Sequence, residues 1–361
     1  MRIFIDIGHP AHVHYFKNTI AYLNSHSHEV FITARDKDVT HLLLDSYSIK
    51  YVSRGKGRKG LIGKLFYLVS ADYQLFKLSK IFKPDVFLSF ASPYAGHVSW
   101  LIGKPHIAFT DTEHAKLGLI SFLPFSDVVL TPKVFNIDLG HKHLRFNGFM
   151  EQCYLQNNYF KPKNAILDKL RLESNEKFVI IRLVSWDASH DIGQKGFSSS
   201  YLLKLVEEVK KYARVFISSE CELPKTLKNF ELEIEATEIH SLLYYAQLFI
   251  GEGATMASEC AILGTPSIYV NTLTAGTLEA QKDQGLLNIY HSSEGIIKKT
   301  VEILSDEKSK ERQQRRCRKS LKDNIDVNKF INWFILNYPS SFEQLKNNPN
   351  HMNKFHLNNI F

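Results

Sequence analysis

The sequence predicts an α/β protein made of two doubly wound domains, each with a parallel sheet between helices. Three observations lead to this fold class. Short runs of β-branched and aromatic residues alternate with segments of helical period along both halves of the chain. A polar stretch without a strand pattern, residues 150–176, separates the two halves. The length of 361 residues exceeds what a single hydrophobic core usually supports, which also favours two domains.

The first domain, placed at residues 1–155, alternates strand-like and helical segments. The strands are RIFIDIG (2–8), EVFITAR (29–35), IKYVSR (49–54), PDVFLSF (84–90), PHIAFTD (105–111) and DVVLTP (127–132). Helices are predicted over 15–25, 39–45, 61–81 and 94–102. Because strands joined through helices run parallel, their carboxyl ends are expected at one edge of the sheet.

The second domain, placed at residues 170–320, repeats the pattern. Its strands are predicted as FVIIRLVSW (178–186), RVFISS (214–219), LEIEA (232–236), LFIGEG (248–253) and PSIYV (266–270). An apolar helix within 321–340 is expected to cross back to the first domain. Residues 341–361 are polar and are expected to form a flexible tail. A ligand is expected in a cleft at the carboxyl ends of both sheets.

Composition narrows the class of protein. No apolar run is long enough to span a bilayer, and the first residues lack the apolar core of a signal peptide, which favours a cytoplasmic protein. The four cysteines form no C-x-x-C pair, so a zinc ribbon is not expected. The formal net charge of +8 is concentrated in residues 54–64 and 308–322. The first of these suits a mobile loop in peripheral contact with an anionic membrane at its inner face. Neither interleaves aromatic with basic residues, so nucleic acid is not expected as a partner.

One stretch of the second domain, residues 249–270, has the order strand, glycine turn, helix and second strand. Gly251 and Gly253 would let the backbone of the turn approach another group closely. The turn would also present the free N–H groups and the positive dipole end of the helix, which suit a phosphate. Glu259 follows one helical turn later on a partly exposed face, where its carboxylate could accept hydrogen bonds from sugar hydroxyls. The alternative is an ordinary βαβ turn that binds no ligand.

Titratable residues follow two strands of the first domain. His9, His12 and His14 come after the first strand, and Asp111 and Glu113 come after the fifth. A histidine at a helix N-terminus has a lowered pKa and suits a general base, and the acidic pair is a second active-site candidate. The alternative is that these side chains only cap helices or bond to local backbone. No carboxylate or thiol completes a zinc set beside the histidines, so no metal is expected.

Two cationic residues of the second domain are candidates for binding the substrate. Arg182 lies at the end of the first strand, and Lys195 follows in the next loop. An arginine at a strand end can clamp a diphosphate and neutralise the charge that develops on a leaving group. The alternative for Arg182 is a surface salt bridge.

With these residues in view, the chain resembles proteins of GT-B type, which have two Rossmann-like doubly wound domains facing a central cleft and bind a sugar nucleotide mainly in the second. It is most similar to the domain-of-unknown-function family 354, a group regarded as predicted glycosyltransferases. The resemblance covers most of residues 1–340. It rests on DIGHPAHVHYFKN (6–18), FTDTEHA (109–115) and GEGATMASECAILGTP (251–266).

The last segment is similar to the G-G-T-x-x-E-x-x-x-x-G-x-P pattern, in which turn glycines approach a diphosphate and the glutamate holds the ribose hydroxyls. The resemblance implies that Glu259 holds the ribose. It also implies that the donor substrate lies near Gly251, Gly253, Ala254, Thr255, Met256 and Ser258. Ala254 stands where the pattern has its second glycine.

The other two segments resemble different enzymes. AHVHYF (11–16) is similar to the G-H-V segment of the enzyme that adds N-acetylglucosamine to lipid-linked muramyl peptide, and it maps that histidine onto His12. FTDTEHAKLG (109–118) is similar to the H-x-E-A-G segment of non-hydrolysing sugar-nucleotide 2-epimerases, and it maps their glutamate onto Glu113. The epimerases also carry an H-R-R-E-N segment, from which VSWDASHD (184–191) departs. Sugar transfer is therefore the leading expectation.

The expected enzyme is an inverting, metal-independent glycosyltransferase without a cofactor. It would move a sugar from a nucleotide donor, expected to be UDP-linked, to a hydroxyl acceptor in surface-polysaccharide or lipid-linked glycan synthesis. His12 or Asp111 would take the acceptor proton. Arg182 and the N-terminus of the helix after the turn would stabilise the diphosphate, with Glu259 on the ribose.

Two alternatives belong to other classes. The first is a 2-epimerase in which Asp111 and Glu113 exchange a proton. The second is a polyanion-binding protein without enzymatic activity, which would use the basic segments. Because Glu259 is expected to be partly exposed, its replacement by alanine should change folding stability by less than about 1 kcal/mol.

Overall fold

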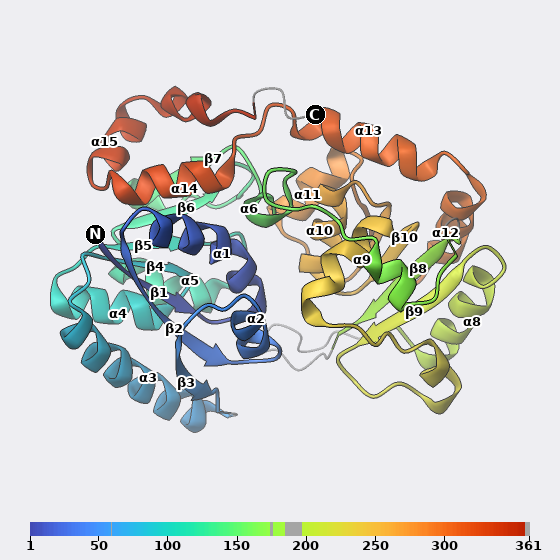
Figure 1. The fold of residues 1–361 in the computed structure, drawn as a ribbon, viewed down its shortest axis with the longest axis horizontal. Helices are drawn as coiled ribbons and strands as arrows, with labels where there is room; N and C mark the ends of the chain where they lie inside the picture. The colour runs from blue at the N-terminus through green and yellow to red at the C-terminus, as the bar shows by residue number, and fades with distance from the viewer. Residues whose placement is uncertain (59, 174–175, 185–196, 358–361) are drawn as a thin grey trace. The chain divides into compact units, whose positions relative to one another are not determined.

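The chain folds into two compact units (Figure 1). The computed structural model describes residues 1–58, 60–173, 176–184 and 197–357. Unit 1 comprises Met1–Tyr154 and the C-terminal segment from Asp323, and unit 2 comprises Leu155–Lys322. Both units contain parallel strands joined through helices, which confirms the predicted α/β class with two doubly wound sheets.

Unit 1 is built on a seven-stranded sheet in the order β3-β2-β1-β4-β5-β6-β7, in which every neighbouring pair is parallel. The strands are β1 (Arg2–Ile7), β2 (Glu29–Asp36), β3 (Val52–Lys56), β4 (Val86–Phe90), β5 (His106–Phe109), β6 (Val128–Pro132) and β7 (His143–Phe146). β7 was not expected because its sequence, HLRF, is short and half polar. The chain order reverses between β1 and β4, so the carboxyl ends of these two strands border the crevice in which ligands of open α/β sheets bind.

Helices cover both faces of this sheet. One face carries α3 (Leu61–Phe82), α4 (Pro93–Ile102) and α5 (Lys116–Phe122). The opposite face carries α1 (Pro10–Ser25), α2 (Thr40–Ser46) and α14 (Val327–Leu336). α14 comes from the segment that was expected to cross back, and Thr19 Oγ1 on α1 donates to Asn328 Oδ1 on α14 at 2.8 Å. Among the described helices, none is both long and apolar enough to cross a membrane.

Unit 2 is built on a five-stranded parallel sheet in the order β12-β11-β10-β8-β9. The strands are β8 (Phe178–Leu183), β9 (Arg214–Ser219), β10 (Leu248–Gly251), β11 (Ser267–Val270) and β12 (Asn288–Tyr290). The helices are α6 (Gln152–Leu155, which starts in unit 1), α7 (Ala165–Lys169), α8 (Ser199–Val209), α9 (Ile239–Tyr245), α10 (Ala254–Leu263), α11 (Gly276–Asp283), α12 (Ile296–Ser305) and α13 (Ser309–Leu321). Buried side chains of β8 to β11 pack against α8 and α12 to form its core.

The strand expected over 232–236 is wrong. Glu231 makes an isolated bridge to Ile217 of β9, and a 3₁₀ helix, Ala236–Glu238, follows. The reason is local, because the side chains of Glu235 and Glu238 form a capping box that starts the 3₁₀ turn.

The flexible tail expected over 341–361 is also wrong for the residues that the structure describes. The segment forms α15 (Ser340–Asn347) and a 3₁₀ helix, Pro349–Phe355. Leu345 is buried, and the ring centroids of Trp333 and Phe355 lie 5.3 Å apart. Apolar packing onto α14 therefore orders a segment whose composition is polar.

A buried carboxylate joins the strand ends of unit 1. Asp6, at the end of β1, accepts hydrogen bonds from Arg54 Nε of β3 at 2.8 Å and from Thr33 Oγ1 of β2 at 2.8 Å. It also accepts one from Ser92 Oγ, the N-cap of α4, at 2.5 Å. All four residues are buried. The ion pair thus connects β1, β2, β3 and the turn after β4.

The burial of Arg54 corrects the expectation for the basic segment 54–64. Arg54 Nη1 donates to the hydroxyl of Tyr67 on α3 at 3.0 Å, and the guanidinium carbon lies 4.5 Å from the ring centroid of Tyr94 on α4. The first residue of the basic segment is therefore held inside the unit by charge pairing and ring contacts. It is not available to a polyanion.

We expect Asp6→Ala to destabilise unit 1 by about 3 to 5 kcal/mol, because the guanidinium of Arg54 would remain buried without its anion. Urea unfolding followed by circular dichroism measures the change. Glu29→Ala is the control, since it removes an exposed pair with Arg2 (3.3 Å) and should cost less than about 1 kcal/mol. Equal losses in the two variants would contradict the role given to Asp6.

Candidate functional site

Two histidines lie at the carboxyl end of β1 and bond to backbone N–H groups. His9 is the N-cap of α1, and its Nδ1 accepts from Ala11 N at 3.2 Å. The Nδ1 atom of His12 accepts from Gly8 N at 3.3 Å. Pro10 at the first helical position fits this start, because it has no N–H to satisfy. The two imidazole centroids are 5.8 Å apart.

Both histidines are neutral at pH 7. Burial, followed by the charges of Lys37 and Arg35, lowers the pKa of His9 to about 3. Burial, with contributions from His9 and Lys37, lowers the pKa of His12 well below its usual value. Because Nδ1 of each ring accepts a hydrogen bond, the single proton of each neutral ring lies on Nε2. Each ring therefore offers an N–H donor, whereas the sequence suggested His12 as a base.

The structure does not bring His14 to this edge. Its ring is buried and stacks on Tyr154 of α6 at 5.2 Å between centroids, with the hydroxyl of Tyr47 at 3.4 Å from Nδ1. Two residues along a helix lie about 200° apart around its axis, so His12 and His14 face in nearly opposite directions. His14, which was a candidate for binding substrate together with His9, therefore lies apart from His9 and His12.

The acidic candidates lie at the end of β5. Burial raises the pKa of Asp111 from 3.8 to about 6, and the charge of Glu113 adds to the rise. Glu113 is buried, and its Oε1 accepts from Asn136 N at 3.1 Å. Asp111 is thus a carboxylate that gains or loses a proton near neutral pH, which a general acid or base requires.

The histidines and Asp111 share one edge of the sheet. β4 pairs with both β1 and β5, so the ends of β1 and β5 are two strand spacings apart, about 9 to 10 Å. His12 leans over the end of β4, where its ring centroid is 4.8 Å from that of Phe90. Two N–H donors and one carboxylate therefore lie at strand ends along the same edge of the sheet. Among the described residues, no group of three or more His, Cys, Asp or Glu side chains could hold a metal ion.

On unit 2, the turn after β10 leads into a helix that starts at a glycine. Gly253 is the N-cap of α10, and no side chain among the described residues caps it. Ala254 is exposed, and Thr255 and Met256 are half-buried, so the backbone of the first turn can be reached from solvent. Free N–H groups and the helix dipole make this terminus suitable for an anion.

Gly251 and Gly253 differ in the physical reason for having no side chain. At Gly251 an added Cβ would lie 2.5 Å from Phe249 Cζ and 2.9 Å from Arg182 Cβ, so internal packing excludes a side chain. At Gly253 the nearest atom to such a Cβ is Val184 Cγ1 at 3.4 Å, an ordinary contact. Packing therefore explains the glycine at position 251. It does not explain the glycine at position 253, where close approach of a ligand is the remaining reason.

Glu259 is buried, which corrects the expectation of a partly exposed face. Its relative exposure is 4 %, and its Oε1 lies 3.0 Å from Nε2 of His240, which is buried on α9. α10 is buried on nearly all sides after its first turn, so a polar side chain at this position requires a partner inside the unit.

Ser258 bonds to a neighbouring helix inside unit 2. It is buried, and its Oγ accepts from Gln281 Nε2 of α11 at 2.7 Å. The structure thus separates Ser258 from Ala254, Thr255 and Met256, which remain together at the first turn of α10.

Arg182 forms the salt bridge that was its alternative interpretation. Nη1 donates to Ser218 Oγ at 2.7 Å, and Nη2 donates to Glu220 Oε1 at 2.5 Å. Its side chain is about one-fifth exposed, so a phosphate could compete for the same guanidinium. Lys195, the second cationic candidate, lies outside the described residues.

Glu252 is a residue that the sequence reasoning missed. It is buried, and its two carboxylate oxygens accept from Val184 N at 3.1 Å and from Phe197 N at 2.6 Å. These donors are the described residues on either side of 185–196. The available signal was an acid between two glycines at the end of a buried strand, where burial demands a partner. Glu252 therefore holds the backbone of Val184 and Phe197 next to the first turn of α10.

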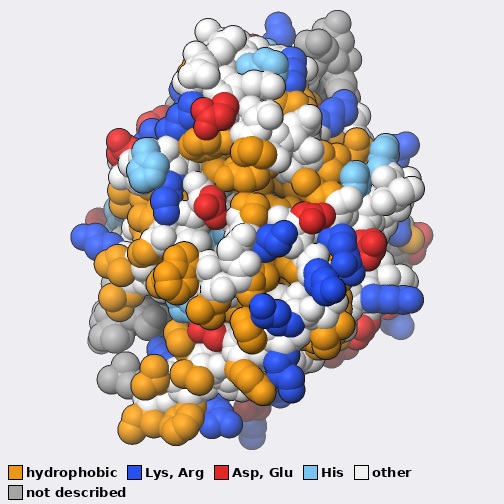
Figure 2. Space-filling model, turned by 90° about the vertical axis from the view of Figure 1, so that its left-hand side faces the viewer, with side chains coloured by type: hydrophobic (Ala, Val, Ile, Leu, Met, Phe, Trp, Pro, Cys, Tyr) orange, Lys and Arg blue, Asp and Glu red, His pale blue; other side chains and the backbone are white. Residues whose placement is uncertain are grey.

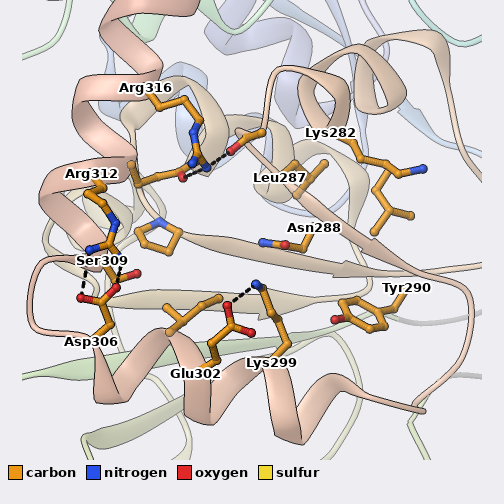
Figure 3. Close-up of a pocket in the computed structure, with 15 residues that line it drawn as sticks. Lys282, Leu287, Asn288, Tyr290, Lys299, Glu302, Asp306, Ser309, Arg312 and Arg316 are labelled. Carbon is orange, nitrogen blue, oxygen red and sulfur yellow. Dashed lines mark hydrogen bonds and ion pairs between the residues drawn. The ribbon is translucent and has the colours of Figure 1, made fainter.

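A cavity of about 390 Å³ on unit 2 lies elsewhere, along the edge strand β12 between α12 and α13 (Figure 3). Its cations are already paired: Lys299 with Glu302 at 2.7 Å, and Arg312 with Asp306. Arg316 donates to the carbonyl of Gly285 at 2.8 Å. The pocket contains none of the predicted site residues.

Solved structures similar to this one are enzymes of GT-B type. UDP-GlcNAc 2-epimerase from Neisseria meningitidis bound to UDP-GlcNAc matches with a TM-score of 0.68 and 13 % identity, over 87 % of this chain and 94 % of that one. Spinosyn rhamnosyltransferase SpnG complexed with spinosyn aglycone matches with a TM-score of 0.55 and 12 % identity, over 88 % of this chain and 95 % of that one. At these identities the likeness shows the fold, which is of GT-B type.

Sequence comparison identifies the family. An uncharacterized protein of Methanocaldococcus jannaschii is 27 % identical over 279 residues, which are 74 % of this chain and 80 % of that protein. One family model, described as "Protein of unknown function (DUF354)", matches residues 1–332. The match covers unit 2, unit 1 up to residue 332 and all three segments that carried the resemblance. The chain therefore belongs to the DUF354 family.

Proposed function

We propose that this protein is an inverting glycosyltransferase that moves a sugar from a UDP-linked donor to a hydroxyl acceptor, in the synthesis of a surface polysaccharide or a lipid-linked glycan. The observation that carries the proposal is Asp111, a carboxylate at a strand end whose pKa of about 6 suits a general base. Solved structures of similar fold contain UDP-GlcNAc or UDP, which supports a nucleotide-sugar ligand.

In the proposed reaction the acceptor oxygen attacks the anomeric carbon of the sugar. The bond between that carbon and the diphosphate breaks, and UDP leaves with the electron pair. Asp111 takes the proton of the acceptor hydroxyl. The Nε2–H groups of His9 and His12 donate hydrogen bonds to oxygens of the acceptor or the sugar and hold them in place. One base is sufficient for this single displacement, and the step uses no metal.

The donor would be held by unit 2. The N–H groups of the first turn of α10 would bind the diphosphate, and the helix dipole would stabilise the charge on the leaving UDP. Arg182 would add a cation by exchanging Glu220 for a phosphate oxygen. Glu259 would accept the ribose hydroxyls while its Oε1 stays bonded to His240.

Calorimetry with UDP, UDP-GlcNAc, UDP-glucose and UDP-galactose tests the first step, since at least one of the sugar nucleotides should bind. Transfer of radiolabelled sugar to a cell-derived lipid extract tests the second step. Failure of all four compounds to bind would end the proposal.

A 2-epimerase is the second candidate. Asp111 and Glu113 follow the same strand, and the charge of Glu113 raises the pKa of Asp111, as expected for carboxylates that exchange a proton. An epimerase would incorporate deuterium at C2 of the sugar in heavy water without an acceptor. A transferase would leave C2 unlabelled.

The first prediction concerns pH. kcat/KM should increase with pH to a plateau and be half-maximal near pH 6, because the base must be ionised. Asp111→Asn should lower kcat by about 10²- to 10⁴-fold and leave UDP affinity unchanged. The raised pKa means that ionisation of Asp111 costs stability as pH rises from 3.8 to about 6, so at pH 7 the variant should unfold at no lower temperature than the wild type. The control is Glu29→Gln, because Glu29 is the first residue of β2 and lies at the amino edge of the sheet, opposite to Asp111. A wild-type kcat for Asp111→Asn would exclude Asp111 as the base.

The second prediction concerns Glu259. Because the residue is buried beside His240, Glu259→Ala should cost about 1 to 3 kcal/mol of stability, more than the sequence alone suggested. Glu259→Gln retains an acceptor for His240 and should fold, yet bind UDP about tenfold more weakly. The loss should be smaller for 2′-deoxy-UDP. Glu279→Gln on α11 is the matched control, and unchanged UDP affinity in Glu259→Gln would remove the ribose assignment.

The third prediction separates the glycines. Gly251→Ala should destabilise unit 2 by about 1 to 3 kcal/mol, because its Cβ would collide with Phe249 and Arg182. Gly253→Ala should fold like the wild type and bind UDP about tenfold more weakly, since its methyl group would stand beside the N–H groups of α10. Thermal unfolding and calorimetry measure the two effects. Normal UDP binding by Gly253→Ala would argue against a phosphate at this turn.

A further inference from the structure

The outward side of α3 is apolar along most of its length. Its exposed apolar side chains include Ile62, Leu65, Phe66, Val69 and Tyr73, each 60–74 % exposed. Their spacing of three or four residues places them on one side of the helix. The opposite side is also used, because Tyr67, Ala71 and Leu75 are buried in unit 1. A surface helix usually turns polar residues outward. This apolar stripe therefore indicates that α3 packs against something else in addition to the core of unit 1.

Two adjacent helices extend the stripe into a larger surface. α4 exposes Trp100 and Leu101, and α5 exposes Leu117 (85 %) and Ile120 (66 %). α3, α4 and α5 lie next to one another on the same face of the sheet. Figure 2 looks onto the left-hand side of Figure 1, and hydrophobic side chains gather in its lower part with Lys and Arg side chains beside them. We call the outer surface of these helices the α3–α5 face.

The exposed charges of the α3–α5 face are positive. Its exposed lysines are Lys64, Lys77, Lys80 and Lys116. The acidic residue of these helices, Asp72, is paired with His97 at 2.9 Å, and this hydrogen bond raises the pKa of His97. The Nζ atom of Lys77 lies 5.3 Å from the ring centroid of Tyr73, so a cation borders the apolar stripe directly. The face therefore combines apolar side chains with cations that no exposed acid balances.

This combination fits the surface of an anionic lipid bilayer. Apolar side chains enter the headgroup region there, while lysines extend toward the lipid phosphates. Contact with a second copy through the same face would bring its lysines together, and lysine is depleted in protein interfaces. Single-stranded nucleic acid requires a row of aromatic rings, whereas most side chains of this stripe are aliphatic. We infer that the α3–α5 face docks the protein peripherally on membranes that contain anionic phospholipids.

The face begins next to the candidate base. α5 starts shortly after Asp111, and α3 starts shortly after the end of β3, so the first turns of both helices lie at the carboxyl edge of the sheet. These turns carry Ile62 and Leu117, which are among the exposed apolar residues. Docking would therefore bring the carboxyl edge of unit 1 close to the lipid headgroups, where the hydroxyl of a lipid-linked acceptor resides. This link to the acceptor rests on the proposed function, whereas the docking itself does not.

Vesicle sedimentation of the full chain tests the inference. Vesicles of phosphatidylcholine with phosphatidylglycerol should bind the protein at least about tenfold more strongly than phosphatidylcholine alone, and added salt should weaken the binding. Leu65→Ser/Phe66→Ser should lower the partition coefficient at least about tenfold. Lys77→Glu/Lys80→Glu should abolish the preference for anionic vesicles. The control is Leu42→Ser, because Leu42 is 50 % exposed on α2 at the other face of the sheet and should not affect binding.

Several outcomes would overturn the inference that the α3–α5 face docks on membranes. They are absence of vesicle binding, equal binding to neutral and anionic vesicles, and unchanged binding of the Leu65→Ser/Phe66→Ser variant with a wild-type melting temperature. A dimer that this variant loses in ultracentrifugation, without vesicle binding by the wild type, would assign the face to a second copy. Calorimetry with UDP, run on the same proteins, keeps the two proposals apart, because all of these variants should bind UDP like the wild type. Failure of the wild type to bind UDP would end the proposed reaction and leave the vesicle result intact.

Discussion

The carboxylate of Asp6 is the interaction on which the carboxyl edge of unit 1 depends. It lies at the end of β1 and is bonded to side chains from β2, β3 and the N-cap of α4, so four distant segments share one buried anion. Removing either partner of a buried ion pair is strongly destabilising, so this pair holds the four segments together. β1 and β4 border the crevice where the chain order reverses, and the turn after β1 carries His9 and His12. The geometry of the two histidines follows from this anchor.

Unit 2 relies on buried carboxylates in the same way. Glu252 bonds to the backbone on both sides of 185–196, and Glu259 bonds to His240 on the neighbouring helix. Each acid is removed from water and satisfied by N–H groups, as buried charges require. What remains accessible at the turn after β10 is the backbone of the first turn of α10. An anion would therefore meet N–H groups first, and Glu252 would act by shaping the turn that presents them.

Part of the candidate site could be predicted from local patterns. A strand that runs into a helix places the connecting turn at the carboxyl edge, so His9, Asp111 and Gly253 were located correctly at strand ends. The direction of side chains further along each helix could not be predicted. His14 and Ser258 face tyrosine rings and a glutamine from other helices, and those partners come from segments far away in the chain. Glu252 was missed because nothing in its own sequence shows which N–H groups it would meet.

The sequence by itself determined the two doubly wound units, most of their strands and the turns that carry the candidate residues, because strand composition, helical period and glycine stops are local properties. Tertiary structure alone decided which charges are buried. Arg54 is buried because it pairs with Asp6, 48 residues away. Glu259 is buried beside His240, 19 residues away. The same holds for the polar C-terminal segment, which is ordered by ring packing between Trp333 and Phe355. In each case the free energy of the side chain depends on contacts between distant segments, and no local pattern encodes them.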